Sequence, residues 1–98
     1  MSDLRELILD AKNWKTQDDF YDSFFQAVGA PPWHGRNLNA LRDSISVGRI
    51  NTIEAPYELR LKNLSSSGAG VRSIVGAFVQ LINELHEAGY PVDIKIEN

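Results

Sequence analysis

Residues 71–96, VRSIVGAFVQLINELHEAGYPVDIKI, contain the clearest structural signal in the chain. Apolar side chains recur at helical spacing through the first part of this segment, which predicts a helix from about Val71 to Ala88. Gly89 is suited to end that helix. From Val92 to Ile96 every second residue is apolar, which predicts a final strand. The apolar stripe of the helix comprises Val71, Ile74, Val75, Phe78, Leu81, Ile82 and Leu85.

A second strand is predicted upstream of this helix. Apolar and charged residues alternate from Tyr57 to Lys62, and the small-residue segment from Asn63 to Gly70 (NLSSSGAG) then forms a loop. Two strands joined through a long helix fit a right-handed βαβ crossover. The two strands are therefore expected to lie parallel.

The first half of the chain adds one strand and two helices. Leu4 to Leu9 (LRELIL) has three apolar residues in a row, which favours a strand buried on both faces, with a helical turn as the alternative. Thr16 opens a helix with Asp19 in a variant capping box, and Gly29 ends that helix before two prolines. A second helix is predicted from about Asn37 to Ser46.

These elements predict an α/β fold in which a three-stranded parallel sheet is packed with about three helices, in a single domain over residues 1–98. The alternation in the last strand predicts an edge position with one wet face. Apolar residues make up 43% and charged residues 23% of the chain, which is typical of globular proteins. There are no cysteines, which excludes a disulfide framework and thiolate chemistry.

The charge balance favours a protein partner over nucleic acid. The net charge is −3, whereas direct phosphate binding needs a basic surface. The N-terminal MSDLRELILDAKNW lacks the features of a signal peptide, and no segment reaches the roughly 18 apolar residues of a membrane span. We therefore expect a soluble, cytoplasmic protein that meets neither nucleic acid nor a membrane directly.

Catalysis and cofactor binding find little support in the sequence. His34 and His86 lack the spacing of a zinc site. The segment SSSGAG, residues 65–70, could hold an anion through its backbone N–H groups but lacks the Lys-Ser/Thr of a phosphate-binding loop. Ser46, His34 and Asp43 could form a triad, but no nucleophile elbow surrounds Ser46. We expect no enzyme activity, metal, cofactor or small-molecule ligand, and keep a minor enzyme or anion-binding protein as the third alternative.

The predicted helix from Asn37 to Ser46 has one apolar and one polar face. Asn37 can cap this helix through its side-chain oxygen. The loop before the helix carries Trp33 and His34, and tryptophan is common at the centres of protein interfaces. The apolar stripe comprises Leu38, Leu41 and Ile45. The polar stripe comprises Asn39, Arg42, Asp43 and Ser46.

PPWHGRNLNALRDSIS, residues 31–46, resembles the core motif of the barstar family. In this family an aromatic pair leads to a glycine, then to Asn-Leu-Asp-Ala-Leu and a Trp-Asp pair. The order of the flanking elements is similar too, so the resemblance covers roughly residues 4–97 and implies a barstar-like fold. Gly35 is expected to permit a backbone conformation that is costly for other residues. The matching residues are Gly35, Asn37, Leu38, Ala40, Leu41 and Asp43.

The resemblance implies a protein inhibitor. In barstars this loop and helix plug the active site of a secreted ribonuclease, and helix carboxylates meet the basic residues that would otherwise hold RNA phosphate. We therefore expect an immunity protein against a nuclease toxin, with a barstar-like interaction module that inhibits no nuclease as the alternative. Asp43 matches the family's most important inhibitory carboxylate, and Glu84 aligns with a second acidic contact. The residues expected to bind the partner are Trp33, His34, Asn39, Arg42, Asp43, Ser46 and Glu84.

Three positions depart from the family in charge. Asn39 replaces a carboxylate, Arg42 replaces a tryptophan, and Arg36 replaces an acidic residue. The expected binding face thus loses two negative charges and gains two positive ones. We expect the partner to differ from the ribonuclease that the founding member inhibits. Arg42 could instead pair with Asp43 or Asp22 within the chain.

Two connections also depart from the family. Residues 47–56 (VGRINTIEAP) form a longer connection than in the founding member, and residues 63–70 are too short for the family's extra helix. Ile50 and Ile53 of the longer connection could contact the partner or fold back onto the core.

Overall fold

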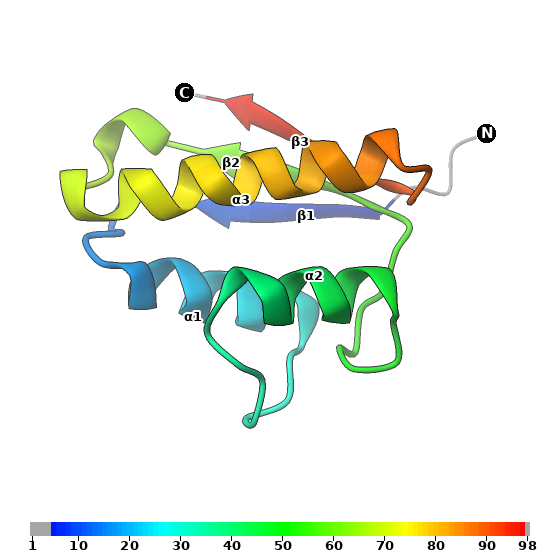
Figure 1. Cartoon of the computed structure of the whole chain (residues 1–98). Helices are drawn as coiled ribbons and strands as arrows, with labels where there is room; N and C mark the ends of the chain where they lie inside the picture. Colours follow the sequence, from blue (N-terminus) through cyan, green and yellow to red (C-terminus); the bar gives the residue numbers. More distant parts are fainter. Residues whose placement is uncertain (1–4, 98) are drawn as a thin grey trace.

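The computed structural model describes residues 5–97 and contains three strands, three α-helices and one short 3₁₀ helix (Figure 1). Leu4, where the first strand was expected to begin, lies outside the described residues. The α/β fold is confirmed. In chain order the elements are β1 (Arg5–Asp10), α1 (Gln17–Val28), α2 (Leu38–Ser46), β2 (Tyr57–Lys62), η1 (Leu64–Ser66), α3 (Ala69–Glu87) and β3 (Val92–Glu97).

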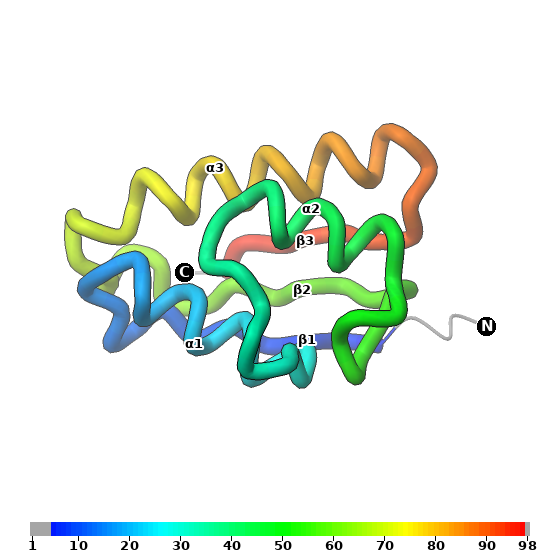
Figure 2. Tube along the Cα trace, turned by 60° about the horizontal axis from the view of Figure 1, so that its bottom comes forward, coloured from blue at the N-terminus to red at the C-terminus, as the bar shows by residue number. Residues whose placement is uncertain are grey.

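The strands form one parallel sheet in the order β1-β2-β3, which confirms both the parallel pairing and the edge position of the last strand. Helix α1 packs on β1 and α3 packs on β3, while α2 packs against α3 (Figures 1 and 2). Leu59 in the middle of β2 pairs with Leu7 on one side and Ile94 on the other. Within the described residues, no helix is both long and apolar enough to span a membrane.

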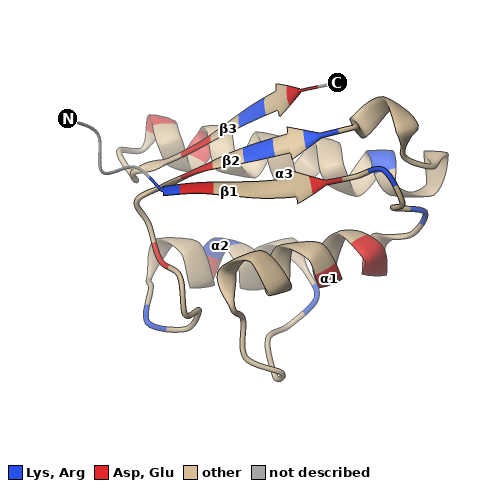
Figure 3. Cartoon of the chain, turned by 180° about the vertical axis from the view of Figure 1, so that it is seen from behind, with Lys and Arg blue, Asp and Glu red and all other residues tan. Residues whose placement is uncertain are grey.

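The first strand is buried on one face only, so the expectation of burial on both faces was wrong. Leu7 and Leu9 point into the core, but Ile8 is 56% exposed. The reason is that the helices cover a single face of the sheet (Figure 3). Burial therefore alternates along β1, as in any strand with one face in water, although the residues of the run are all apolar.

Aromatic rings fill the space between the covered face of the sheet and the helices. Phe78 of α3 lies 4.9 Å from Phe20 and 5.2 Å from Phe24, measured between ring centroids, in edge-to-face arrangements. All three side chains are fully buried. These contacts fix the positions of α1 and α3 relative to each other on the covered face of the sheet.

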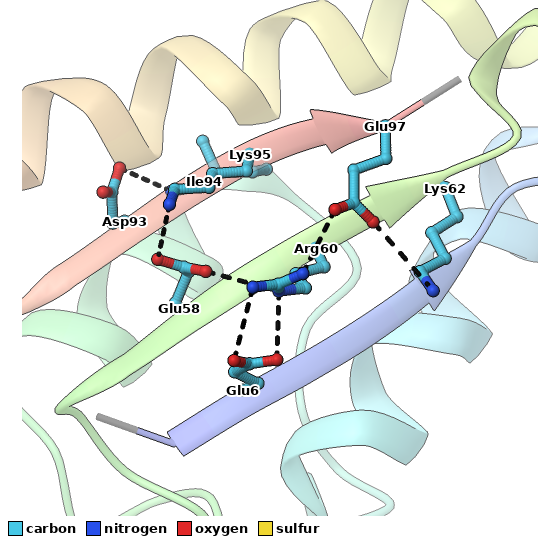
Figure 4. A network of polar contacts seen from close by, with 8 residues as sticks. All are labelled: Glu6, Glu58, Arg60, Lys62, Asp93, Ile94, Lys95 and Glu97. Atoms are coloured by element: carbon cyan, nitrogen blue, oxygen red, sulfur yellow. Dashed lines mark hydrogen bonds and ion pairs between the residues drawn. The ribbon is translucent and has the colours of Figure 1, made fainter. Parts of the chain in front are cut away.

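The uncovered face of the sheet carries a network of ion pairs (Figures 3 and 4). Arg60 of the central strand reaches Glu6 on β1 at 3.0 Å and Glu97 on β3 at 3.2 Å. Glu58 lies 3.4 Å from Arg60 and 3.5 Å from Lys95. Because these charges satisfy one another across all three strands, this face is stable in water without a further layer of helices.

Helix α1 begins and ends as predicted. The carboxylate of Asp19 accepts hydrogen bonds from the backbone N–H groups of Lys15 and Thr16, and these bonds lower the pKa of Asp19. Gly29 follows the helix with φ of 66°, a left-handed conformation that costs glycine little. Helix α3, by contrast, begins at Ala69, two residues earlier than predicted, and so takes in part of the expected loop.

The two unusual connections differ in how they are held. Residues 47–56 have no helix or strand and fold back onto the end of α1, where the N–H groups of Thr52 and Ile53 donate to the carbonyls of Gly29 and Val28. Ile53 packs against the core, which was one of the two alternatives for this residue, the other being contact with the partner. The connection between β2 and α3 contains only the single turn η1.

Candidate functional site

The site is built on the loop between α1 and α2, which projects away from the sheet (Figure 1). Asn37 fixes where this loop turns into helix, because its side-chain oxygen accepts the N–H of Ala40 at 2.8 Å. The backbone of Gly35 does not adopt a left-handed conformation, so that part of the expectation was wrong. A side chain at Gly35 would instead crowd Ala40 and Asn37, each 3.2 Å from its Cβ position. Close packing is thus the reason for this glycine.

We expect Asn37→Ala to lower the free energy of unfolding by about 1 kcal/mol, because the Ala40 N–H loses its acceptor. In a domain of this size that loss corresponds to a melting temperature lower by roughly 4–8 °C. Thermal unfolding followed by circular dichroism measures it. Asn39→Ala is the matched control, since Asn39 is exposed two residues further on. Equal melting temperatures for the two variants would contradict the capping role of Asn37.

Three of the predicted site residues surround one small hollow of about 150 Å³. Trp33 forms an outer wall and is 73% exposed, while Asp43 contributes from α2. We call this depression the Asp43 hollow; its lining comprises Trp33, His34, Gly35, Ala40, Asp43 and Ile50. The motif of residues 31–46 thus converges on a concave surface, joined there by one residue of the 47–56 connection.

His34 lies under the hollow, with only 7% of its surface exposed. Its ring lies 4.6 Å from that of Phe25, and Nδ1 lies 2.9 Å from the carbonyl oxygen of Gly35. A carbonyl oxygen only accepts, so Nδ1 carries a proton and donates to it. Nε2 is buried and has no hydrogen-bond partner among the described residues. Because Nε2 is enclosed, His34 contributes its packed ring to the wall of the hollow, and Asp43 contributes the exposed carboxylate.

Asp43 is the open charge of this surface. Its side chain is exposed, and within residues 5–97 its carboxylate has neither an ion pair nor a hydrogen bond. The expected pair of Arg42 with Asp43 or Asp22 is wrong. Arg42 instead binds Glu84 on α3, with Nη2 2.8 Å from Oε1. Asp43 is therefore free for a cation supplied from outside the chain.

Arg36 is also neutralised within the chain. Its guanidinium reaches Asp22 at 2.5 Å and Asp18 at 3.2 Å and lies 5.5 Å from the centre of the Phe25 ring. Both arginines that were expected to make the face more positive are thus paired with acidic residues. The negative potential at Asp43 is consequently preserved, despite the unfavourable count of charges in the sequence.

The remaining predicted residues lie along a groove between α2 and α3, or on α2 itself. Ser46 donates to the carbonyl of Arg42 at 2.6 Å, four residues earlier on its own helix. No hydrogen bond within residues 5–97 links Ser46, His34 and Asp43, so they do not form a triad. The α2–α3 groove, of about 270 Å³, is lined by Leu38, Asn39, Arg42, Ala77, Gln80, Leu81 and Glu84.

Two further lining residues bear on the site: Ile50, for which contact with the partner was one of two alternatives, and Gln80, which the sequence did not place there. Ile50 lines the Asp43 hollow, so the two isoleucines of the 47–56 connection divide between the site and the core. Gln80 donates to Glu84 Oε2 at 3.3 Å in the α2–α3 groove. An apolar residue within an irregular loop was the only sequence signal for Ile50, and Gln80 gave none.

Comparison with known proteins agrees with this geometry. The model of the family described as "Barstar (barnase inhibitor)" matches residues 4–97. A curated relative, the putative ribonuclease inhibitor YrdF of Bacillus subtilis (strain 168), is 26% identical over 84 residues. That alignment covers 86% of this chain and 88% of the relative. The family match over residues 4–97 includes the α1–α2 loop, α2 and α3.

Proposed function

Because this chain belongs to the barstar family, we propose that it is an inhibitor of a ribonuclease-type toxin and acts by covering the active site of that enzyme. The free carboxylate of Asp43 beside a concave surface is the observation that carries the proposal. A ribonuclease holds RNA phosphate with cationic side chains. Asp43 would take the place of a phosphate, and one cationic side chain of the enzyme would enter the hollow.

The other site residues have distinct parts in this proposal. Trp33 supplies exposed aromatic surface at the rim, and the buried ring of His34 packs on Phe25 and holds the loop that carries Trp33. Asn39, Arg42 and Ser46 extend the contact along α2 toward the ion pair that Arg42 forms with Glu84 of α3. The fold presents these groups on a helix that is capped at its start and packed on α3, so little backbone change is expected on binding. The inhibitor would act in the cytoplasm, as an immunity protein.

An interaction module that inhibits no nuclease is the second candidate. It is favoured by the loss of negative charge along the helix, since Asn39 is neutral and Glu84 is already paired with Arg42. Such a module would use the same hollow to bind one cationic side chain of another protein.

The test is inhibition of ribonuclease activity by the purified chain, measured over a panel of secreted ribonucleases that includes barnase. Stoichiometric inhibition of at least one enzyme, lost on changing Asp43, supports the inhibitor. Binding to a panel member with no loss of its activity supports the module. Neither binding nor inhibition across the panel would contradict the proposal of a ribonuclease inhibitor.

Association with the partner is expected to slow as salt is added. The chain carries a net charge of −3 and its site holds an unpaired carboxylate, so encounter with a cationic active site is steered by electrostatics. Between about 0.05 M and about 0.5 M salt we expect the association rate constant to fall on the order of tenfold. Stopped-flow fluorescence measures it. A rate independent of salt would point instead to an apolar contact through Trp33 and Ile50.

A further inference from the structure

Both carboxylate oxygens of Glu84 accept hydrogen bonds from neighbouring side chains. Oε1 accepts from Arg42 Nη2 at 2.8 Å, and Oε2 accepts from Gln80 Nε2 at 3.3 Å. The hydrogen bond from Arg42 is the main cause of the lowered pKa of Glu84. Both side chains of the ion pair are nearly half exposed, so the pair lies at the surface where a partner would arrive. A carboxylate at this place is therefore visible to a partner but already bound to a cation.

Helix α2 holds Arg42 at a position from which its side chain reaches Glu84. It follows Leu41, which is fully buried and anchors α2 in the core, so the backbone that carries Arg42 cannot shift easily. Its neighbour Asp43 faces the Asp43 hollow, while Arg42 lines the α2–α3 groove. Arg42 and Asp43 are consecutive in the sequence but lie on different parts of the surface. One part has the free carboxylate of Asp43, and in the other the carboxylate of Glu84 is paired with Arg42.

We propose that Arg42 is a specificity-determining residue, which occupies Glu84 and thereby withdraws that carboxylate from the partner. This inference rests on the proposed function and names the kind of ribonuclease that the site takes. A partner cation opposite α3 would have to displace Arg42 or meet its positive charge, and both are unfavourable. The site accordingly takes an enzyme that presents one cation to Asp43 and a neutral or acidic group opposite Arg42.

Removing Arg42 tests this inference, with barnase as the probe. Arg42→Ala frees Glu84 for the cationic side chains with which a ribonuclease holds RNA phosphate, so its affinity for barnase should rise by at least about tenfold over wild type. Arg42→Ala combined with Glu84→Gln should cancel the gain. Arg72→Ala, which removes an equal charge from α3 outside the groove, should produce no comparable gain. Isothermal titration calorimetry measures all four proteins.

The same variants are read without any partner by carbon NMR titration of the Glu84 carboxyl. Its pKa should rise in Arg42→Ala and stay unchanged in Arg72→Ala, because Arg42 is the cation that pairs with Glu84 among residues 5–97. An unchanged Glu84 pKa in Arg42→Ala would overturn the inference whatever the protein binds. The inference would also be overturned if Arg42→Ala gained no more affinity for barnase than Arg72→Ala. The same holds if the gain persisted when Glu84→Gln is added to Arg42→Ala. If Asp43→Ala abolishes inhibition of some ribonuclease while Arg42→Ala changes no affinity, the inhibitor function stands and this inference fails.

Discussion

Replacing Asp43 by alanine is expected to weaken binding to the inhibited ribonuclease by well over tenfold, on the order of 2 kcal/mol or more. The reason is that the carboxylate has no partner within the described chain, so its hydrogen bonds and charge are available to the enzyme. Closure of the interface would exclude water from the Asp43 hollow and strengthen the pairing. Removal of the carboxylate would leave a cation of the enzyme buried without its counter-charge.

Titration calorimetry against an enzyme that the wild-type chain inhibits measures this loss. Asp93→Ala is the matched control, because Asp93 carries the same charge on the open face of the sheet, beside the network of Figure 4. The control separates the local effect from the change in net charge, and its affinity should stay near that of wild type. An Asp43→Ala variant with wild-type affinity would remove Asp43 from the binding surface.

Replacing Phe78 by alanine is expected to lower the free energy of unfolding by about 3–5 kcal/mol. The ring is fully buried and contacts Phe20 and Phe24, so its removal leaves a cavity where α1 and α3 meet the sheet. A domain of this size has only about 5–15 kcal/mol of stability in total. The loss would therefore leave a substantial unfolded fraction even under mild denaturing conditions.

Urea unfolding followed by tryptophan fluorescence provides the measurement. Ile8→Ala is the control, since Ile8 is an apolar residue on the uncovered face of the sheet and should change stability by no more than roughly 0.5 kcal/mol. A Phe78→Ala variant that loses less than about 1 kcal/mol would show that the aromatic cluster repacks around the missing ring.

Elements in which apolar residues recur at a regular spacing could be predicted from the sequence. The stripe that includes Phe78 predicted α3, and alternation predicted β2 and β3, because one face of each meets the core. The run of apolar residues around Ile8 was misleading, since period alone does not tell whether a second layer covers a strand. Local capping by Asn37 was equally predictable, because its partner Ala40 lies three residues away.

The partners of the site charges could not be predicted in the same way. Arg42 and Glu84 are separated by 42 residues, and their contact depends on how α2 crosses α3. Adjacency in the sequence suggested Asp43 as a partner of Arg42, yet the side chains of consecutive helical residues diverge. The burial of His34, a loop residue, depends likewise on its contact with Phe25 of α1. Family resemblance indicated which face to examine but could not assign these contacts.

The two walls of the Asp43 hollow come from connections that share one anchor, the end of α1. The connection that carries Ile50 is tied there through the hydrogen bonds of Thr52 and Ile53 to the last carbonyls of the helix, and the loop that carries Trp33 starts from the same point. Folding therefore already meets the entropic cost of ordering both walls. Partners that fit the hollow differently should then differ chiefly in how long each complex lasts, so selectivity would be expressed as residence time.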